Sequence, residues 1–222
     1  MDGTGKLFDP FIRLLPQGTS QEKLQTVVIN YPVDVRLTYE QLAVRVFAQL
    51  PAAKPFVIVA ESFSGPVALL LAEKCGGNLR AVVLVSSFVR QPLSSLGTWI
   101  ARLPWTLMFR LRPPLWILRW LLMDSTTPST LVREVREAIA SVQPDVLAAR
   151  LRDALRVDCA KVAHDCPARI VCLTAQKDRL LPRRNQMPPA AQVLPVSGPH
   201  LLLQCVPEAA VKAMQGAGLF AL

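Results

Sequence analysis

The chain has 222 residues, of which 51% are hydrophobic and 18% charged, and its formal net charge is +9. This length fits a single globular α/β domain. Five cysteines, an odd number, argue against a disulfide framework and favour a reducing cytoplasm. Residues 1–10 have neither a basic start nor an apolar core, so we predict no signal peptide and a cytoplasmic protein. Despite the positive charge, no nucleic-acid-binding module or aromatic–basic interleaving is present.

Strand and helix patterns alternate in the first part of the chain. A strand is predicted at 26–30, followed by a helix from about Tyr39 to Leu50 with a capping box at Thr38 and Gln41. Three further elements follow: a strand at 55–60, a helix at 65–75 and a strand at 81–85. Such alternation predicts a mostly parallel sheet with right-handed crossovers, and therefore an α/β fold.

A serine stands at the junction between a strand and a helix. The β-branched run that starts at Val57 ends at Ser62, and a strong helix former begins directly afterwards. Strand, tight turn and helix with serine at the apex form a nucleophile elbow, in which the positions two before and two after the serine must be small. Here these positions hold Ala60 and Ser64 in place of the usual glycines. The alternative is a buried serine at an ordinary strand–helix junction.

Two more polar side chains follow predicted strands. The strand at 169–174 leads to Asp178, and the strand at 191–195 leads to His200, before a helix that begins at Pro207. Ligands bind at the carboxyl ends of the strands in open parallel sheets, so Ser62, Asp178 and His200 are expected at one edge. Asp158 is the other candidate acid, but its place ahead of a strand favours a structural role.

The alternation of strands and helices stops between about residues 91 and 158, where helical patterns and prolines replace strands. The segment 103–123 is long enough for a transmembrane helix, yet three arginines and a double proline argue against one. We expect an apolar acyl pocket under a mobile lid, or simple packing of this region on the core. An exposed part of it would contact lipid or a second copy. The candidate pocket residues are all four tryptophans: Trp99, Trp105, Trp116 and Trp120.

Three motifs in this order resemble the α/β-hydrolase superfamily: Ala60–Gly65, Lys177–Pro182 and Gly198–Leu202. Within it the chain resembles small bacterial carboxylesterases, a group that includes pimeloyl-carrier-protein methyl ester esterase. The resemblance implies a core at 1–90 and 159–222, with a helical cap at 91–158. It implies a cofactor-free serine carboxylesterase for short to medium acyl chains. Thioesters or carrier-protein esters are the alternative substrates, and a catalytically silent scaffold used in binding or assembly is the alternative of another class.

The triad chemistry follows from the residue types. His200 would deprotonate Ser62 and later protonate the leaving group, while Asp178 would orient the imidazole. The backbone N–H of Phe63 would supply one oxyanion donor, and Met1 is a candidate for the second.

The start of the chain resembles the loop after the third strand of the family's sheet, at Asp2–Gly5. We therefore expect a sheet shortened at the N-terminus. Three explanations stay open: a longer natural protein, direct pairing of 26–30 with 56–60, or another chain covering the edge.

Two remaining patterns concern metals and partners. Cys159, His164 and Cys166 lie close together but match no standard zinc spacing, so we predict no metal. The amphipathic segments 131–142 and 146–157 suggest either a solvated helix face or a surface for an acidic acyl carrier protein. A homo-oligomer is also expected to compensate for the shortened sheet. The arginines of these two segments are Arg133, Arg136, Arg150, Arg152 and Arg156.

Overall fold

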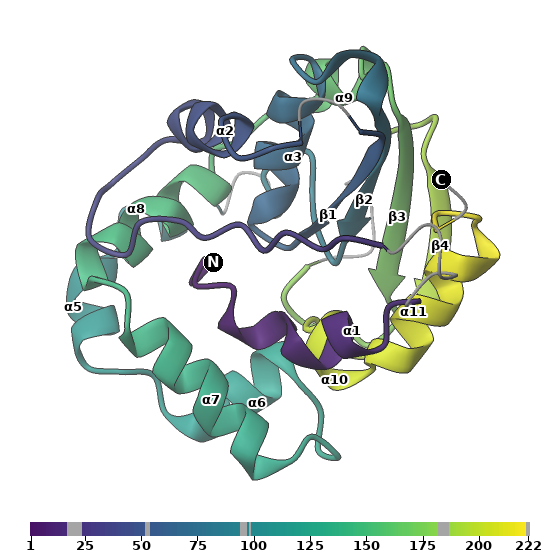
Figure 1. Ribbon diagram of the computed structural model, residues 1–222. Coiled ribbons are helices and arrows are strands. Elements are labelled where there is room, and N and C mark those ends of the chain that lie inside the picture. The colour runs from purple at the N-terminus through teal and green to yellow at the C-terminus, as the bar shows by residue number, and fades with distance from the viewer. Residues whose placement is uncertain (17–23, 52–53, 94–96, 98, 182–186, 221–222) are drawn as a thin grey trace.

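A parallel sheet forms the centre of the computed structural model, which describes residues 1–16, 24–51, 54–93, 97, 99–181 and 187–220 (Figure 1). Within these residues the sheet has four strands in the order β1-β2-β3-β4, and every neighbouring pair is parallel. The predicted parallel α/β sheet is therefore confirmed. The strands are β1 (Phe56–Glu61), β2 (Leu79–Val85), β3 (Arg169–Ala175) and β4 (Gln192–Val196).

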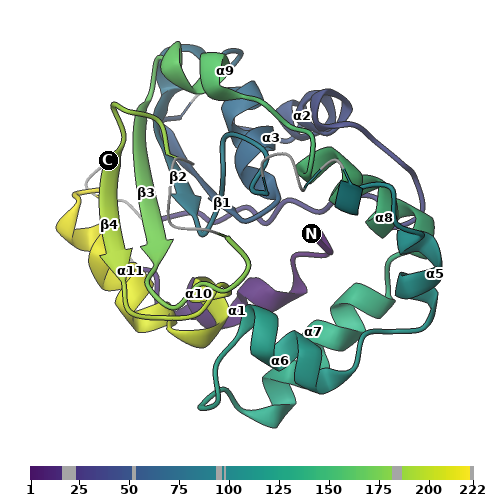
Figure 2. The same ribbon diagram turned by 180° about the vertical axis from the view of Figure 1, so that it is seen from behind.

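Helices cover both faces of this sheet, as Figures 1 and 2 show from opposite sides. Because side chains alternate along a strand, Val83 and Val82 on β2 serve opposite faces. Val83 packs in the cluster with Phe11 and Met214, whereas Val82 packs in the cluster with Leu69 and Ala163. The sheet is thus the middle layer of three. The helices on the first face are α1 (Asp9–Arg13) and α11 (Pro207–Gly216), and those on the second are α3 (Ser64–Ala72) and α9 (Ala160–His164).

The remaining elements connect or extend these layers. The predicted capping box is present, with the Thr38 hydroxyl accepting from the Gln41 backbone and the Gln41 side chain accepting from the Thr38 backbone. It begins α2 (Tyr39–Phe47), a helix that packs on α3. The elements not yet given are η1 (Lys6–Phe8), η2 (Gly76–Asn78), α5 (Trp105–Arg110), α6 (Leu115–Leu122), α7 (Ser129–Ala140), α8 (Pro144–Ala154) and α10 (Leu202–Cys205).

The predicted strand at 26–30 is wrong, and so is its pairing with 56–60. The segment has no strand hydrogen bonds, and β1 is an edge strand of the sheet in the described part of the chain. The segment instead lies against the N-terminal residues, where the Tyr31 N–H donates to the Gly3 carbonyl at 2.8 Å. Val27 and Val28 are exposed, so their β-branched side chains do not contribute the burial that would fix a strand in the sheet.

Four helices between residues 105 and 154 lie beside the sheet layers. α5 packs on α8, and α6 packs on α7. Leu7 of η1 and Leu201 pack against the cluster around Leu118 and Val132, so α6 and α7 also contact the core. In Figures 1 and 2 the N-terminal segment runs between these helices and the sheet. No helix in the described ranges is long and apolar enough to cross a membrane.

Candidate active site

Ser62 occupies a strained turn directly after β1. Its φ is 53°, a left-handed conformation that side chains other than glycine rarely adopt. Two hydrogen bonds hold the turn: the Ser62 N–H donates to the Val85 carbonyl at 2.9 Å, and the Ser87 hydroxyl donates to the Ser62 carbonyl at 2.7 Å. Such strain persists only where the surroundings fix it, and it concentrates at functional sites.

Close packing explains the glycine that follows this turn. A Cβ atom added to Gly65 would lie 1.9 Å from the Ser87 hydroxyl oxygen. The start of α3 therefore approaches the end of β2 so closely that only glycine fits at position 65. The elbow motif requires small residues at positions 60 and 64, and the structure adds position 65 as the one that packing restricts to glycine.

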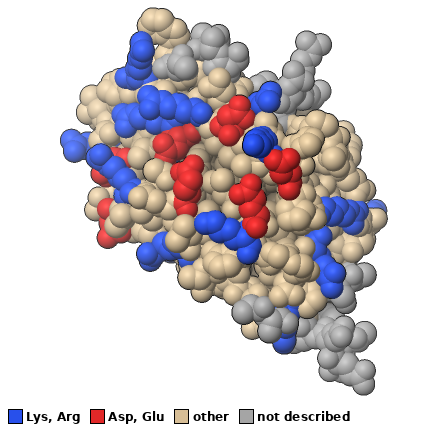
Figure 3. All heavy atoms as spheres, turned by 90° about the horizontal axis from the view of Figure 1, so that it is seen from above, with Lys and Arg blue, Asp and Glu red and all other residues tan. Residues whose placement is uncertain are grey.

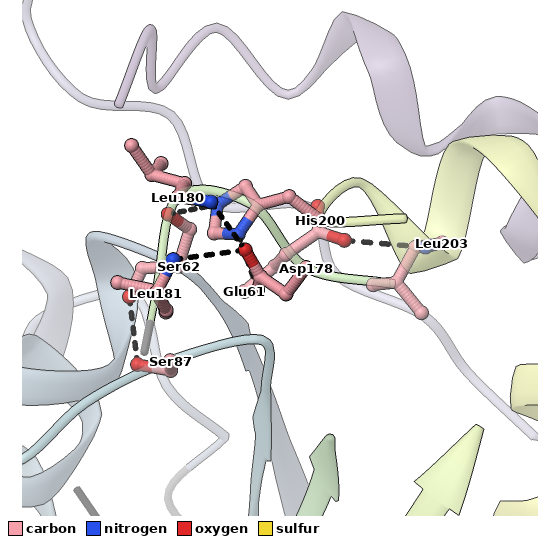
Figure 4. A network of polar contacts seen from close by, with 8 residues as sticks. All are labelled: Glu61, Ser62, Ser87, Asp178, Leu180, Leu181, His200 and Leu203. Atoms are coloured by element: carbon pink, nitrogen blue, oxygen red, sulfur yellow. Dashed lines mark hydrogen bonds and ion pairs between the residues drawn. The ribbon is translucent and has the colours of Figure 1, made fainter. Parts of the chain in front are cut away.

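Ser62, Asp178 and His200 meet at the carboxyl edge of the sheet (Figure 4). The His200 Nε2 atom lies 2.9 Å from the Ser62 hydroxyl oxygen, and its Nδ1 atom lies 2.8 Å from Asp178 Oδ2. His200 is 1% exposed, so its ring is held by protein atoms. The second Asp178 oxygen accepts the backbone N–H groups of Leu180 and Leu181 at 2.8 and 2.9 Å. Pro182, the last residue of the predicted loop motif, lies outside the described residues.

This arrangement fixes what the imidazole can do. A carboxylate at Nδ1 favours the tautomer that carries its proton there, which leaves the Nε2 lone pair directed at the Ser62 hydroxyl. The two backbone N–H groups hold the Asp178 carboxylate in place without competing for its Oδ2 atom. The geometry can therefore transfer a proton from serine to histidine.

The two candidate oxyanion residues lie beside this serine. Phe63 directly follows it, and the buried Phe63 ring stacks on Tyr39 with centroids 4.7 Å apart. That packing fixes the backbone that carries the Phe63 N–H. Met1 lines the same small cavity as Ser62, and so do Asp2 and Gly3. The structure thus brings the predicted N-terminal loop to the serine.

A buried carboxylate next to the serine is absent from the sequence prediction. Glu61 precedes Ser62, and its oxygens accept from the Leu203 N–H at 3.2 Å and the Gln204 side-chain amide at 2.9 Å. Burial raises the pKa of Glu61 above its ordinary value. Glu61 therefore ties the end of β1 to α10, the helix that follows His200. In the sequence, only the position of Glu61 next to Ser62 in the elbow motif could have indicated that it has a role at the site.

Arg150 is a second residue whose role the sequence did not reveal. Its side chain is buried, and Nη1 donates to the carbonyls of Met1 and Asp2 at 3.0 and 2.8 Å. Nη2 donates to the Pro32 carbonyl at 2.7 Å. The prediction that Arg150 belongs to a solvated or partner-binding face is wrong, because these carbonyls occupy its guanidinium. In the amphipathic pattern of residues 146–157, nothing distinguishes Arg150 from Arg152 and Arg156.

The tryptophans do not form the predicted pocket. Trp99 is 69% exposed, Trp116 70% and Trp120 58%. Trp105 is half-buried and donates its ring N–H to the Ile100 carbonyl at 2.7 Å. None of these four side chains lines the cavity that contains Ser62. The physical reason on α6 is that Leu118 packs against α7, which leaves Trp116 and Trp120 on the outward side of the helix.

The other candidate polar residues lie away from the triad. Asp158 is exposed and forms an ion pair with Arg90 at 3.5 Å. His164 is exposed beside Asp165, whereas Cys159 is buried in the core. No group of three or more potential metal ligands occurs within the described ranges.

Two hollows adjoin the N-terminal segment. The cavity at Ser62 has a volume of about 80 Å³, and its wall includes Glu61, Tyr31 and Leu201. A larger groove of about 540 Å³ lies between α1 and α7. Leu7 lines both hollows, so it separates the groove from the serine.

The fold is similar to solved structures of hydrolytic enzymes. No family model and no curated protein matches the sequence. An esterase from Thermogutta terrifontis superposes with a TM-score of 0.70 at 18% identity, covering 96% of this chain and 85% of that one. A hydrolase from Oleispira antarctica gives 0.70 at 13% identity, covering 97% and 88%.

A third solved structure has a different named activity on the same fold. The enol-lactonase from Burkholderia xenovorans gives a TM-score of 0.69 at 12% identity, covering all of this chain and 88% of that one. At these low sequence identities the likeness shows a shared fold but does not assign an activity to this chain. The parallel sheet and its two helical layers agree with this likeness, and the chain therefore has an α/β-hydrolase fold.

Proposed function

We propose that this protein is a serine hydrolase that cleaves carboxylic esters through an acyl-enzyme intermediate. The observation that carries the proposal is the pair of short contacts from His200 to Ser62 and to Asp178, at 2.9 and 2.8 Å. A serine hydroxyl needs an adjacent base to become nucleophilic, and that base needs an orienting acid. The α/β-hydrolase fold and the strained turn at Ser62 support the same assignment.

The mechanism follows from the positions of these groups. His200 takes the hydroxyl proton as Ser62 attacks the ester carbonyl, and Asp178 stabilises the imidazolium that forms. The negative charge on the tetrahedral intermediate is bound by the Phe63 N–H and by a backbone N–H of the segment 1–3. His200 then protonates the leaving alkoxide. Water then attacks the acyl carbonyl as it loses a proton to His200. His200 returns this proton to the Ser62 oxygen as the bond to the acyl group breaks, which releases the acid and restores the serine.

The cavity narrows the range of substrates to short acyl groups. Pockets for drug-sized ligands measure roughly 300–1,000 Å³, whereas the cavity at Ser62 holds about 80 Å³. Acetyl to butyryl groups fit this space better than the medium chains that the sequence also allowed. The leaving alcohol would extend past Leu7 into the groove between α1 and α7, where Lys6, Arg13, Glu134 and Glu137 line the wall.

The test is hydrolysis of p-nitrophenyl esters from acetate to dodecanoate. We expect the highest kcat/KM for the shortest esters and loss of activity in Ser62→Ala. A fluorophosphonate should label the wild-type serine and leave the variant unlabelled. Asp158→Asn is the matched control for Asp178→Asn, because Asp158 is exposed and pairs with Arg90. Only the Asp178 change should abolish turnover.

A silent scaffold predicts a different result. Folded wild-type protein would then hydrolyse none of the esters and react no faster with fluorophosphonate than Ser62→Ala does. An incomplete oxyanion site would give a third pattern, in which fluorophosphonate still labels Ser62 faster than the Ser62→Ala variant but both labelling and ester turnover are slow. Thioester substrates of the same acyl lengths would show whether the leaving group matters.

A further inference from the structure

The outer surface of α5, α6 and their flanks is unusually apolar. Seven of the fifteen large hydrophobic side chains exposed by the described residues lie between Trp99 and Trp120. Leu111, at the turn between α5 and α6, is 75% exposed. Clusters of exposed large apolar side chains commonly mark a surface that binds a partner or a membrane. The seven residues, here called the α5–α6 surface, are Trp99, Leu103, Leu107, Met108, Leu111, Trp116 and Trp120.

Helical spacing places these side chains in rows. Leu107 and Leu111, on α5 and at its C-terminal end, are four residues apart, and so are Trp116 and Trp120 on α6. Leu118, on the opposite side of α6, is buried in the cluster with α7. The exposed rows are thus the outward faces of helices whose inward faces already pack on the protein.

The charge of this region has one sign. The sequence contains no acidic residue between Glu73 and Asp124, and arginines are interleaved with the apolar rows. Arg102, Arg110 and Arg112 are exposed, and none takes part in an ion pair among the described residues. By contrast, the face on the side of α2 and α9 carries acidic and basic side chains intermixed (Figure 3).

We propose that the α5–α6 surface docks on an anionic lipid bilayer without crossing it. Tryptophan prefers the boundary between acyl chains and headgroups, and leucine and methionine side chains enter the acyl region beneath it. Arginines at the same level bind lipid phosphates. An anionic bilayer supplies both the apolar phase and the negative charge that this surface lacks. The proposal stands independently of the ester chemistry.

Charge also argues against a second copy as the occupant. A two-fold interface brings the same surface patch of both copies together. The unpaired arginines of one copy would then face those of the other, which is unfavourable. A lipid headgroup layer meets the same arginines with opposite charge.

The surface is joined to the loops that carry Asp178 and His200. The Arg179 guanidinium donates to the Trp120 carbonyl at 2.9 Å and lies 5.8 Å from the Trp120 ring centre. The Leu201 N–H donates to the Leu122 carbonyl at 3.0 Å. Docking through α6 therefore places the carboxyl edge of the sheet close to the lipid surface.

The test is co-sedimentation of the full chain with vesicles. Vesicles of phosphatidylglycerol and phosphatidylcholine in equal parts should pellet the wild type, whereas phosphatidylcholine alone should not. Each arginine near an anionic surface strengthens binding about fivefold, so Arg110→Gln/Arg112→Gln should weaken partitioning about 25-fold. Trp116→Ser/Trp120→Ser should also abolish pelleting, with a thermal unfolding curve like that of the wild type.

α2 supplies matched controls, because Val44, Phe47 and Arg45 are exposed there. Val44→Ser/Phe47→Ser and Arg45→Gln should leave vesicle binding unchanged. Absence of wild-type binding to anionic vesicles would overturn the proposal, as would an equal loss in the α2 variants. It would also fail if the wild type were a dimer that Trp116→Ser/Trp120→Ser converts to a monomer, or if it bound purified acyl carrier protein but no vesicles.

Discussion

Replacing Arg150 with methionine tests how the N-terminal segment is held beside the serine. Methionine keeps much of the buried volume but removes every donor to the Met1, Asp2 and Pro32 carbonyls. Each of these partly buried carbonyls left without a partner costs about 1 kcal/mol, so we expect a loss of about 3 kcal/mol in the free energy of unfolding. For a chain of this length that corresponds to a fall of roughly 6–12 °C in Tm.

The assay is thermal unfolding followed by circular dichroism, together with the rate at which a fluorophosphonate labels Ser62. The labelling rate should fall as well, because residues 1–3 line the cavity at the serine. Arg150→Lys keeps the charge and should recover about half of the lost stability, since an ammonium group cannot reproduce the geometry of the guanidinium fork. Arg133→Met, on the exposed face of α7, is the control and should change stability by less than about 0.5 kcal/mol. A Tm of Arg150→Met equal to that of the wild type would refute the reasoning.

Three other changes probe the frame around the site. Gly65→Ala places a Cβ atom 1.9 Å from the Ser87 hydroxyl and should destabilise the protein by about 2–3 kcal/mol, measured by urea unfolding. The double variant Gly65→Ala/Ser87→Gly should recover much of this loss. If it recovers none, the steric explanation is wrong. Burial raises the pKa of Glu61 above its ordinary value of 4.5. The protonated Glu61 side chain therefore contributes its full stabilisation below pH 4.5, and this stabilisation is lost as the pH rises through the raised pKa. The Tm of the wild type should therefore fall relative to that of Glu61→Gln between weakly acidic and neutral pH, and parallel pH profiles would contradict this. Thr38→Ala removes the side-chain cap of α2 and should cost about 1 kcal/mol in urea unfolding, whereas Thr126→Ala, in a turn outside any helix, should not affect α2.

Local patterns predicted the elements that position the site. The β-branched run before Asp178 is a strand whose side chains are buried on both faces of the parallel sheet. The run before Ser62 is the edge strand, where burial is complete only at its last residues, Ala60 and Glu61. The capping box at Thr38 predicted the start of α2, since its hydrogen bonds form within four residues. Once those strands were assigned, the parallel topology alone placed Ser62, Asp178 and His200 at one edge.

Local sequence patterns could not predict contacts between segments that lie far apart in the sequence. Arg150 differs from its neighbours on α8 only because the carbonyls of Met1, Asp2 and Pro32, more than a hundred residues away in sequence, converge on it. The tryptophans were expected inside because they are large and apolar, but the packing of α6 on α7 needs only Leu118 and its neighbours. The run at 26–30 has the composition of a strand, yet no sheet neighbour receives it in the described structure.

The position of β1 at the edge of the sheet has a consequence for heat inactivation. In the described part of the chain, the strand that leads to Ser62 is hydrogen-bonded along its length to β2 alone, whereas β2 and β3 each have two partner strands. Amide hydrogens on the open side of β1 should exchange with solvent sooner than those of β2 and β3, because edge segments open in local fluctuations of low free energy. The turn at Ser62 is strained and begins where this strand ends. Warming should therefore disorder the serine before the central strands separate, and the midpoint of inactivation should lie below that of global unfolding.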